Sequence, residues 1–166
     1  MNKPHGQLPH KGVLGGISVL TAAALIMSIA PSWADDPQAS QATQAATVVE
    51  KATGTGDLAD AAPVKGSAAQ AVVSTEEGSV TVTAPTDTTG QVNSIAPDGS
   101  VVGIGLPATS NVRGTEASAG TIVYPSAAKA TDVAVQPTTD GAVRALVTLK
   151  NSSAPNEQRF TLNLPQ

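Results

Sequence analysis

The chain has 166 residues, with 9 Lys and Arg against 13 Asp and Glu, two His and no Cys. This length suits one ordinary domain and is too short for two large ones. The absence of Cys excludes disulfide bonds and thiolate nucleophiles. The mild acidity, without any basic cluster, argues against nucleic-acid binding.

The first 34 residues have the three parts of a secretory signal peptide. Two lysines are the only charged residues before Asp35, and an apolar stretch follows over residues 13–30. Ser32 and Ala34 then place small residues at positions −3 and −1 of a cut between Ala34 and Asp35. This pattern predicts export with cleavage at that bond. The alternative is a retained membrane anchor, for which the apolar stretch is near the lower length limit.

Cleavage would leave a chain that lacks several of the residue types used in catalytic and metal sites. Both histidines, both methionines and Trp33 precede Asp35, so residues 35–166 contain no His, Cys, Trp or Met. Nucleophile–histidine pairs are therefore excluded there, and zinc would have to be bound by carboxylates alone. Tyr124 and Phe160 are the only aromatic residues left. Two aromatic rings are too few for a platform that stacks bases or sugar rings.

Residues 35–70 differ in composition from the rest of the chain. They are rich in Ala, Thr and Gln and contain only one Leu and three Val as larger apolar residues. This composition predicts a polar spacer that is mostly disordered. A short helix over residues 38–51 is the alternative, because Ala and Gln favour helix. Its apolar face would be mostly alanine, and such a helix is marginal on its own.

From residue 71 onward, short alternating apolar runs are separated by turns rich in Gly, Pro and Asp. Pro97-Asp98-Gly99 is one such turn, in which Pro presets φ and Gly accepts a positive φ. The expected strands are 72–74, 79–83, 91–95, 101–106, 121–124, 132–136, 142–149 and 157–164, with a long polar loop over 107–120. We therefore predict an all-β domain over residues 71–166, an antiparallel sandwich or open barrel of about eight short strands.

The last expected strand has the clearest alternation. Phe160, Leu162 and Leu164 share one face, and polar residues occupy the other. We expect the apolar face to point inward, with Phe160 buried. In the preceding strand, Leu146 is an apolar exception on a polar face.

Two segments in the second half of the chain carry a resemblance. Residues 138–149 (TTDGAVRALVTL) and 153–160 (SAPNEQRF) are similar to a strand–turn–strand pattern in secreted hypothetical proteins of actinomycete type. The signal peptide and Ala-rich spacer match their layout, and the resemblance covers roughly residues 95–166. It implies export, a β-rich architecture and further sequence beyond Gln166. It brings no activity and no functional residues.

Acidic residues are the first candidates for a site. Asp98 and Asp140 each precede a glycine and could offer oxygens to calcium, but the Asp-x-Asp-x-Asp-Gly spacing is absent. Turn chemistry explains both better. Glu76 and Glu77 are adjacent in a strand-and-turn region, where neighbouring side chains point apart, so they are better explained as a charged hairpin tip.

Three further features are weaker still. Asn151-Ser152-Ser153 has the pattern of a glycosylation site, and we favour an ordinary turn. Arg159 is expected to form a surface ion pair. Gly103-Ile104-Gly105 lacks the third Gly and the helix of a nucleotide fingerprint, so it indicates a bulge or a close backbone approach.

These observations predict a protein that is not an enzyme and has no cofactor and no metal site. We expect an exported, non-catalytic β-domain with a structural or interaction role at or outside the cell surface. Its partner would be a protein or another cell-envelope component, not nucleic acid, with membrane contact only through the uncleaved signal peptide. The alternative is the N-terminal accessory region of a longer exported enzyme or effector. A hydrolase using two carboxylates is a third, weaker hypothesis.

Overall fold

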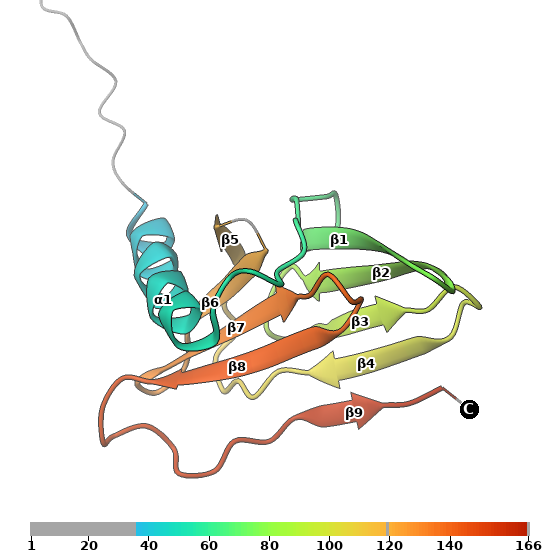
Figure 1. Cartoon of the computed structure of the whole chain (residues 1–166). Helices are drawn as coiled ribbons and strands as arrows, with labels where there is room; N and C mark the ends of the chain where they lie inside the picture. Colours follow the sequence, from blue (N-terminus) through green and yellow to red (C-terminus); the bar gives the residue numbers. More distant parts are fainter. Residues whose placement is uncertain (1–35, 119, 166) are drawn as a thin grey trace, which may run out of the picture. The chain divides into compact units, whose positions relative to one another are not determined.

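Helix α1 (Pro37–Thr53) is the first element in the computed structural model, which describes residues 36–118 and 120–165 (Figure 1). The expected signal peptide and its cleavage site lie outside these residues. Asp36 caps the helix by accepting a hydrogen bond from the backbone N–H of Gln38 at 2.9 Å. Gly54, with a φ of 79°, ends it and donates its N–H to the carbonyl of Glu50 at 2.8 Å.

The described residues after α1 form nine strands in two antiparallel sheets. The five-stranded sheet has the order β1-β2-β3-β4-β9, and the four-stranded sheet has the order β5-β6-β7-β8. The bounds of the first sheet are β1 (Ser67–Thr75), β2 (Gly78–Pro85), β3 (Gln91–Ile95), β4 (Val101–Gly105) and β9 (Thr161–Asn163). Those of the second are β5 (Thr115–Ser118), β6 (Thr121–Ala128), β7 (Thr131–Pro137) and β8 (Val143–Leu149). The mostly β architecture with two antiparallel sheets confirms the expected β-rich, antiparallel character of the domain.

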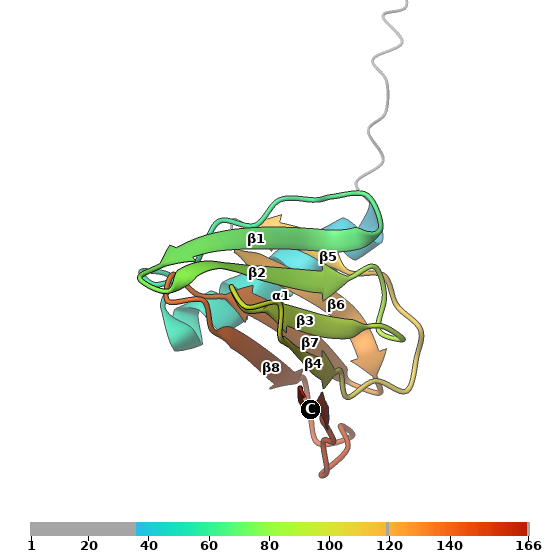
Figure 2. The ribbon, with the colours of Figure 1, turned by 90° about the vertical axis from the view of Figure 1, so that its right-hand side faces the viewer.

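The two sheets pack face to face around one apolar core (Figure 2). Val82 and Val92 come from the five-stranded sheet, and Ile122 and Val133 come from the other; all four are fully buried. Tyr124 lies among them, and its hydroxyl donates a hydrogen bond to the backbone carbonyl of Pro85 at 2.7 Å. The polar end of this buried ring is therefore satisfied.

Helix α1 covers the outer face of the four-stranded sheet. Its buried residues recur at helical spacing and are mostly alanine: Ala42, Ala45, Ala46 and Val49. They pack against Val123 and Ala134, which point outward from β6 and β7, and Leu146 of β8 packs against the same cluster. This contact explains why Leu146 interrupts the polar face of its strand.

The expectation of a mostly disordered spacer over residues 35–70 is therefore corrected for the described part, 36–70. This part forms α1, a linking segment and the beginning of β1. A helix with an alanine face is marginal in isolation. Here its small side chains allow close approach to a sheet, and tertiary burial supplies the missing stability.

Two strand assignments also differ from the expectation. β5 (Thr115–Ser118) lies inside the segment expected to be a polar loop, and it pairs with β6 across a register shift. β9 has only three residues instead of the eight expected over 157–164. The alternation that predicted a long strand is present, but only part of it finds a partner strand.

Candidate functional site

The two sheets differ by one strand, and the difference falls at β9. β1 and β5 are in contact at one side of the sandwich. Counted from that side, β4 is the fourth strand of its sheet, β8 is the last strand of the other, and β9 is one strand further (Figures 1 and 2). β8 and β9 therefore bound a side on which one sheet extends past the other. We call it the open side and define it by Leu149, Phe160, Leu162 and Leu164.

The inner face of β9 is apolar but exposed. Leu162 pairs with Ile104, Ile104 pairs with Val92, and Val92 is fully buried, so these three side chains share the inner face. Leu162 is nevertheless 59% exposed, and Phe160 and Leu164 are 37% and 68% exposed. The register of Leu162 agrees with the expected inward direction, but the expected burial is wrong. The physical reason is that, in the described part of the chain, the opposite sheet ends at β8 and has no strand over β9.

Within residues 36–118 and 120–165, β8 pairs with β7 alone and leaves its other backbone edge unpaired. Its register with β7 is regular along the whole strand. At the two ends of the ladder, the Lys150 N–H donates to the Ala130 carbonyl at 2.8 Å and the Thr138 N–H to the Ala142 carbonyl at 3.0 Å. Because bonded and non-bonded pairs alternate in an antiparallel ladder, four residues of β8 direct their N–H and C=O away from β7. They are Val143, Ala145, Val147 and Leu149.

The opposite side of the sandwich, between β1 and β5, is closed by the chain itself. Ala59 and Ala61 of the segment between α1 and β1 belong to the central core. Ala62 exchanges two backbone hydrogen bonds with Gln70 of β1, at 3.0 and 2.8 Å. Exposure of inner-face apolar side chains is therefore a property of the side bounded by β8 and β9.

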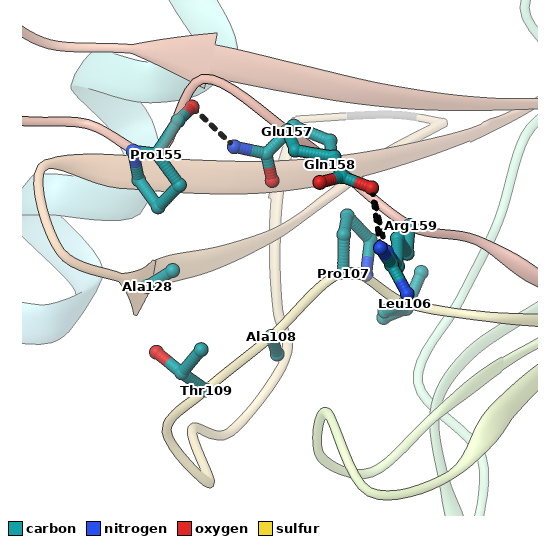
Figure 3. Close-up of a pocket in the computed structure, with 9 residues that line it drawn as sticks. All are labelled: Leu106, Pro107, Ala108, Thr109, Ala128, Pro155, Glu157, Gln158 and Arg159. Atoms are coloured by element: carbon teal, nitrogen blue, oxygen red, sulfur yellow. Dashed lines mark hydrogen bonds and ion pairs between the residues drawn. The ribbon is translucent and has the colours of Figure 1, made fainter.

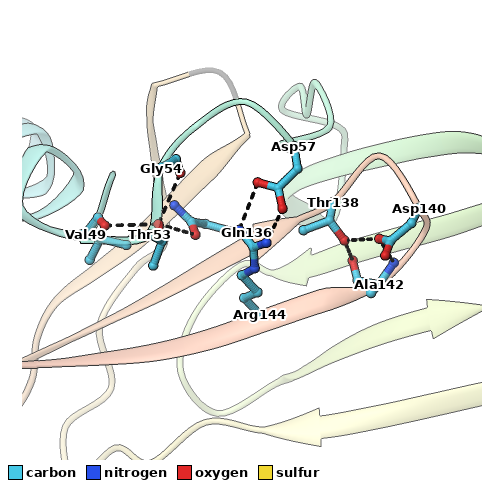
Figure 4. A network of polar contacts seen from close by, with 9 residues as sticks. All are labelled: Val49, Thr53, Gly54, Asp57, Gln136, Thr138, Asp140, Ala142 and Arg144. Atoms are coloured by element: carbon cyan, nitrogen blue, oxygen red, sulfur yellow. Dashed lines mark hydrogen bonds and ion pairs between the residues drawn. The ribbon is translucent and has the colours of Figure 1, made fainter. Parts of the chain in front are cut away.

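A polar network lies along the first half of β8 (Figure 4). The Arg144 guanidinium makes two hydrogen bonds to the Asp57 carboxylate, one of them at 3.1 Å. This contact lowers the pKa of Asp57 below its ordinary value and raises that of Arg144. Beside it, the buried amide of Gln136 donates to the Thr121 hydroxyl at 3.1 Å and accepts from Thr53 of α1 at 3.3 Å. The network connects α1 to the four-stranded sheet, and the Asp57 carboxylate neutralises the charge of Arg144 on β8.

A pocket of about 260 Å³ lies near the start of the last segment, lined by the nine residues of Figure 3. Glu157 is its only acidic residue and accepts a hydrogen bond from Arg159 Nε at 2.7 Å. Gln158 donates its side-chain amide to the carbonyl of Pro155 at 3.0 Å. The pocket thus holds one carboxylate already paired with a cation, which does not suit two-carboxylate hydrolysis. The expected surface ion pair of Arg159 is confirmed.

The aspartates considered for calcium stabilise their own turns. The Ser100 N–H donates to Asp98 at 2.9 Å, and the Ala142 N–H donates to Asp140 at 3.1 Å. These bonds, together with the Thr138 hydroxyl on Asp140, lower the pKa of both carboxyl groups. The turn interpretation is confirmed. Within residues 36–118 and 120–165, no cluster of His, Cys, Asp or Glu could hold a metal ion.

The remaining candidates also have structural roles. Glu76 and Glu77 are exposed in the turn between β1 and β2. The side-chain Oδ1 of Asn151 accepts a hydrogen bond from the backbone N–H of Ser153 at 2.9 Å, as in an ordinary Asx turn. At Gly103 a Cβ would stand 2.6 Å from Gln91 Oε1, so the glycine makes room for an amide side chain that crosses β4. The close approach indicated by the sequence is therefore to a side chain.

The sequence-based search missed the free edge of β8. The available signal was the apolar alternation of residues 143–149 followed by seven residues, 150–156, without strand pattern. That signal indicates an edge strand only once the pairing partners are known. Among the described residues, no helix is both long and apolar enough to cross a lipid bilayer.

No protein-family model, no curated protein and no solved structure matches the chain. The resemblance to secreted actinomycete-type proteins therefore stays a prediction.

Proposed function

We propose that the chain is an exported, non-catalytic β-domain that binds another protein at or outside the cell surface through its open side. The observation that carries the proposal is the exposure of Leu149, Phe160, Leu162 and Leu164 together, at 57%, 37%, 59% and 68%. They make up four of the nine exposed large apolar residues of the described chain. Three of them, Phe160, Leu162 and Leu164, follow one another in and beside β9, and exposed apolar residues that lie close together favour an interaction site.

Two features of the sequence support export and the absence of catalysis. Residues 1–34 have the pattern of a signal peptide. Residues 35–166 lack His and Cys, which most acid–base and nucleophilic sites require. The carboxylates that could replace them are largely engaged as turn caps and ion pairs.

The first experiment determines where the protein is found and where it begins. Mass spectrometry of the protein from the growth medium and cell envelope should find an N-terminus at Asp35. A chain beginning at Met1 in the membrane fraction would instead support the retained anchor.

The second experiment tests the surface in the producing cells. A photo-crosslinking amino acid replaces Leu162, and a control replaces Glu77 at the opposite, charged hairpin. A protein adduct specific to position 162 is expected. Equal adducts at both positions, or none, would contradict a binding role for the open side.

A further inference from the structure

In the described chain, the strand orders leave one position beside β8, opposite β9, without a strand. The sheet that ends at β9 has one strand more than the opposite sheet, whose last strand is β8. A strand added to β8 would lie opposite β9 and cover the inner face of Leu162. It would also give each sheet five strands.

β8 lacks most of the features by which natural edge strands avoid pairing, and its one charged residue, Arg144, is on the outer face and paired with Asp57. It has seven residues, no bulge in its ladder with β7 and no Pro. Its inner-face residues are all apolar: Val143, Ala145, Val147 and Leu149. Charged inward residues, prolines and bulges normally protect such edges.

The outer side of β8 also offers space for side chains. A pocket of about 380 Å³ lies between α1 and the end of β8. Val48 of α1, 55% exposed, lies in its apolar part, and Gln44 and Thr148 contribute polar atoms. An added strand would therefore find contacts for both of its faces, because successive side chains of a strand point to opposite sides.

The charges around the open side favour an uncharged occupant. Each of the three basic side chains there already has an acidic partner. The pairs are Arg144 with Asp57, Lys150 with Asp132, and Arg159 with Glu157. A charged segment would gain no free counter-ion and would lose hydration.

A second copy of the chain does not fit this space by symmetric pairing. If the β8 strands of two copies paired, each β9 would occupy the position of the other copy's β4. If the β9 strands paired, two strand positions between the β8 edges would stay empty. An isologous contact needs a self-complementary surface, and a gap one strand wide is not self-complementary.

We propose that β8 accepts an extended, uncharged segment of a partner protein, with alternating apolar residues, as an added β-strand. Main-chain hydrogen bonds to β8 would supply affinity, and the contacts with Leu162 and the pocket at Val48 would select side chains. This inference rests on the proposed function, since it names how the open side binds its partner.

The test uses the exported protein labelled with ¹⁵N and a defined probe. The probe is a peptide with seven alternating Val and Thr residues and a Gly-Ser tail at each end. Amide hydrogen exchange is followed by NMR. We expect the peptide to slow exchange at Ala145 and Val147, whose N–H groups point away from β7. A peptide with alternate N-methyl groups cannot complete the ladder and should not slow it.

Two variants and one control locate the contact. Ala145→Pro removes an N–H that β7 does not use, and should abolish the protection. Leu162→Lys changes an exposed side chain, keeps the fold, and should abolish it as well. Val72→Lys on β1, where the side chain is 63% exposed, is the matched control and should leave binding unchanged.

Several results would overturn the proposal. One is that the peptide does not slow amide exchange in β8, and another is that the N-methylated peptide slows it equally. A third is that Val72→Lys loses the protection as completely as Leu162→Lys does. A dimer in analytical ultracentrifugation that Leu162→Lys dissociates would show that a second copy is the occupant. If crosslinking in cells gave adducts at position 162 but the peptide did not slow amide exchange in β8, the proposed function would stand and strand addition would be refuted. Protection without adducts would support strand addition and contradict the proposed function.

Discussion

Truncation to alanine at two inner-face positions should have very different costs. Ile122 on β6 is fully buried in the central core, whereas Leu162 on β9, on the inner face of the other sheet, is 59% exposed. Ile122→Ala should lower the free energy of unfolding by about 2–5 kcal/mol, because it loses transfer free energy and leaves a cavity. Full burial of such a side chain is worth about 1.5–3 kcal/mol, so the buried part of Leu162 is worth about 0.6–1.2 kcal/mol. Leu162→Ala should therefore cost about 1 kcal/mol.

Urea denaturation followed by circular dichroism measures both variants against the unchanged protein. The free energy of unfolding of both variants should depend on urea concentration with the same slope. Only Ile122→Ala should lower the midpoint concentration strongly. A loss of about 3 kcal/mol or more in Leu162→Ala would refute the argument that β9 has nothing opposite it. A neutral Ile122→Ala would refute the description of the core.

Three further predictions concern the helix, the core and the turns. Val49→Asp should cost at least about 2 kcal/mol and expose α1 to protease, because Val49 is buried against the sheet, whereas Val48→Asp should not. Gly114→Ala should cost about 1–3 kcal/mol in urea denaturation, since its Cβ would stand 2.6 Å from the buried ring of Tyr124. Hydrogen bonds lower the folded pKa of Asp98 below 3.8, so its stabilisation is full above that pH and is lost as the pH falls further. Asp98→Asn should flatten the acid limb of the melting-temperature profile.

Local patterns were sufficient to predict most strands and turns. The alternation at residues 79–83 and 91–95 and the turn at Asp98 correspond closely to β2, β3 and the loop that joins β3 to β4. These features depend on neighbours in the sequence, since side chains alternate with period two and Gly99 accepts a φ of 84°.

Other features depend on partners far away in the chain. The alanine face of α1 is stable only because Val123 and Ala134 lie outward on the sheet beneath it. The exposure of Leu162 depends on how many strands the opposite sheet contains, which no local pattern records. The sequence therefore predicted the direction of the open-side residues better than their burial.

The single tyrosine at the centre of the core has a practical consequence. Burial raises the pKa of the Tyr124 hydroxyl well above its ordinary value of 10.0. The phenol therefore ionises only when the protein unfolds, and alkali above pH 10 favours the unfolded state. Residues 35–166 contain no Trp, so the ultraviolet absorbance of this one ring reports global unfolding without an added label. Any indole fluorescence in a preparation would come from Trp33, and would show that the segment before Asp35 is still attached.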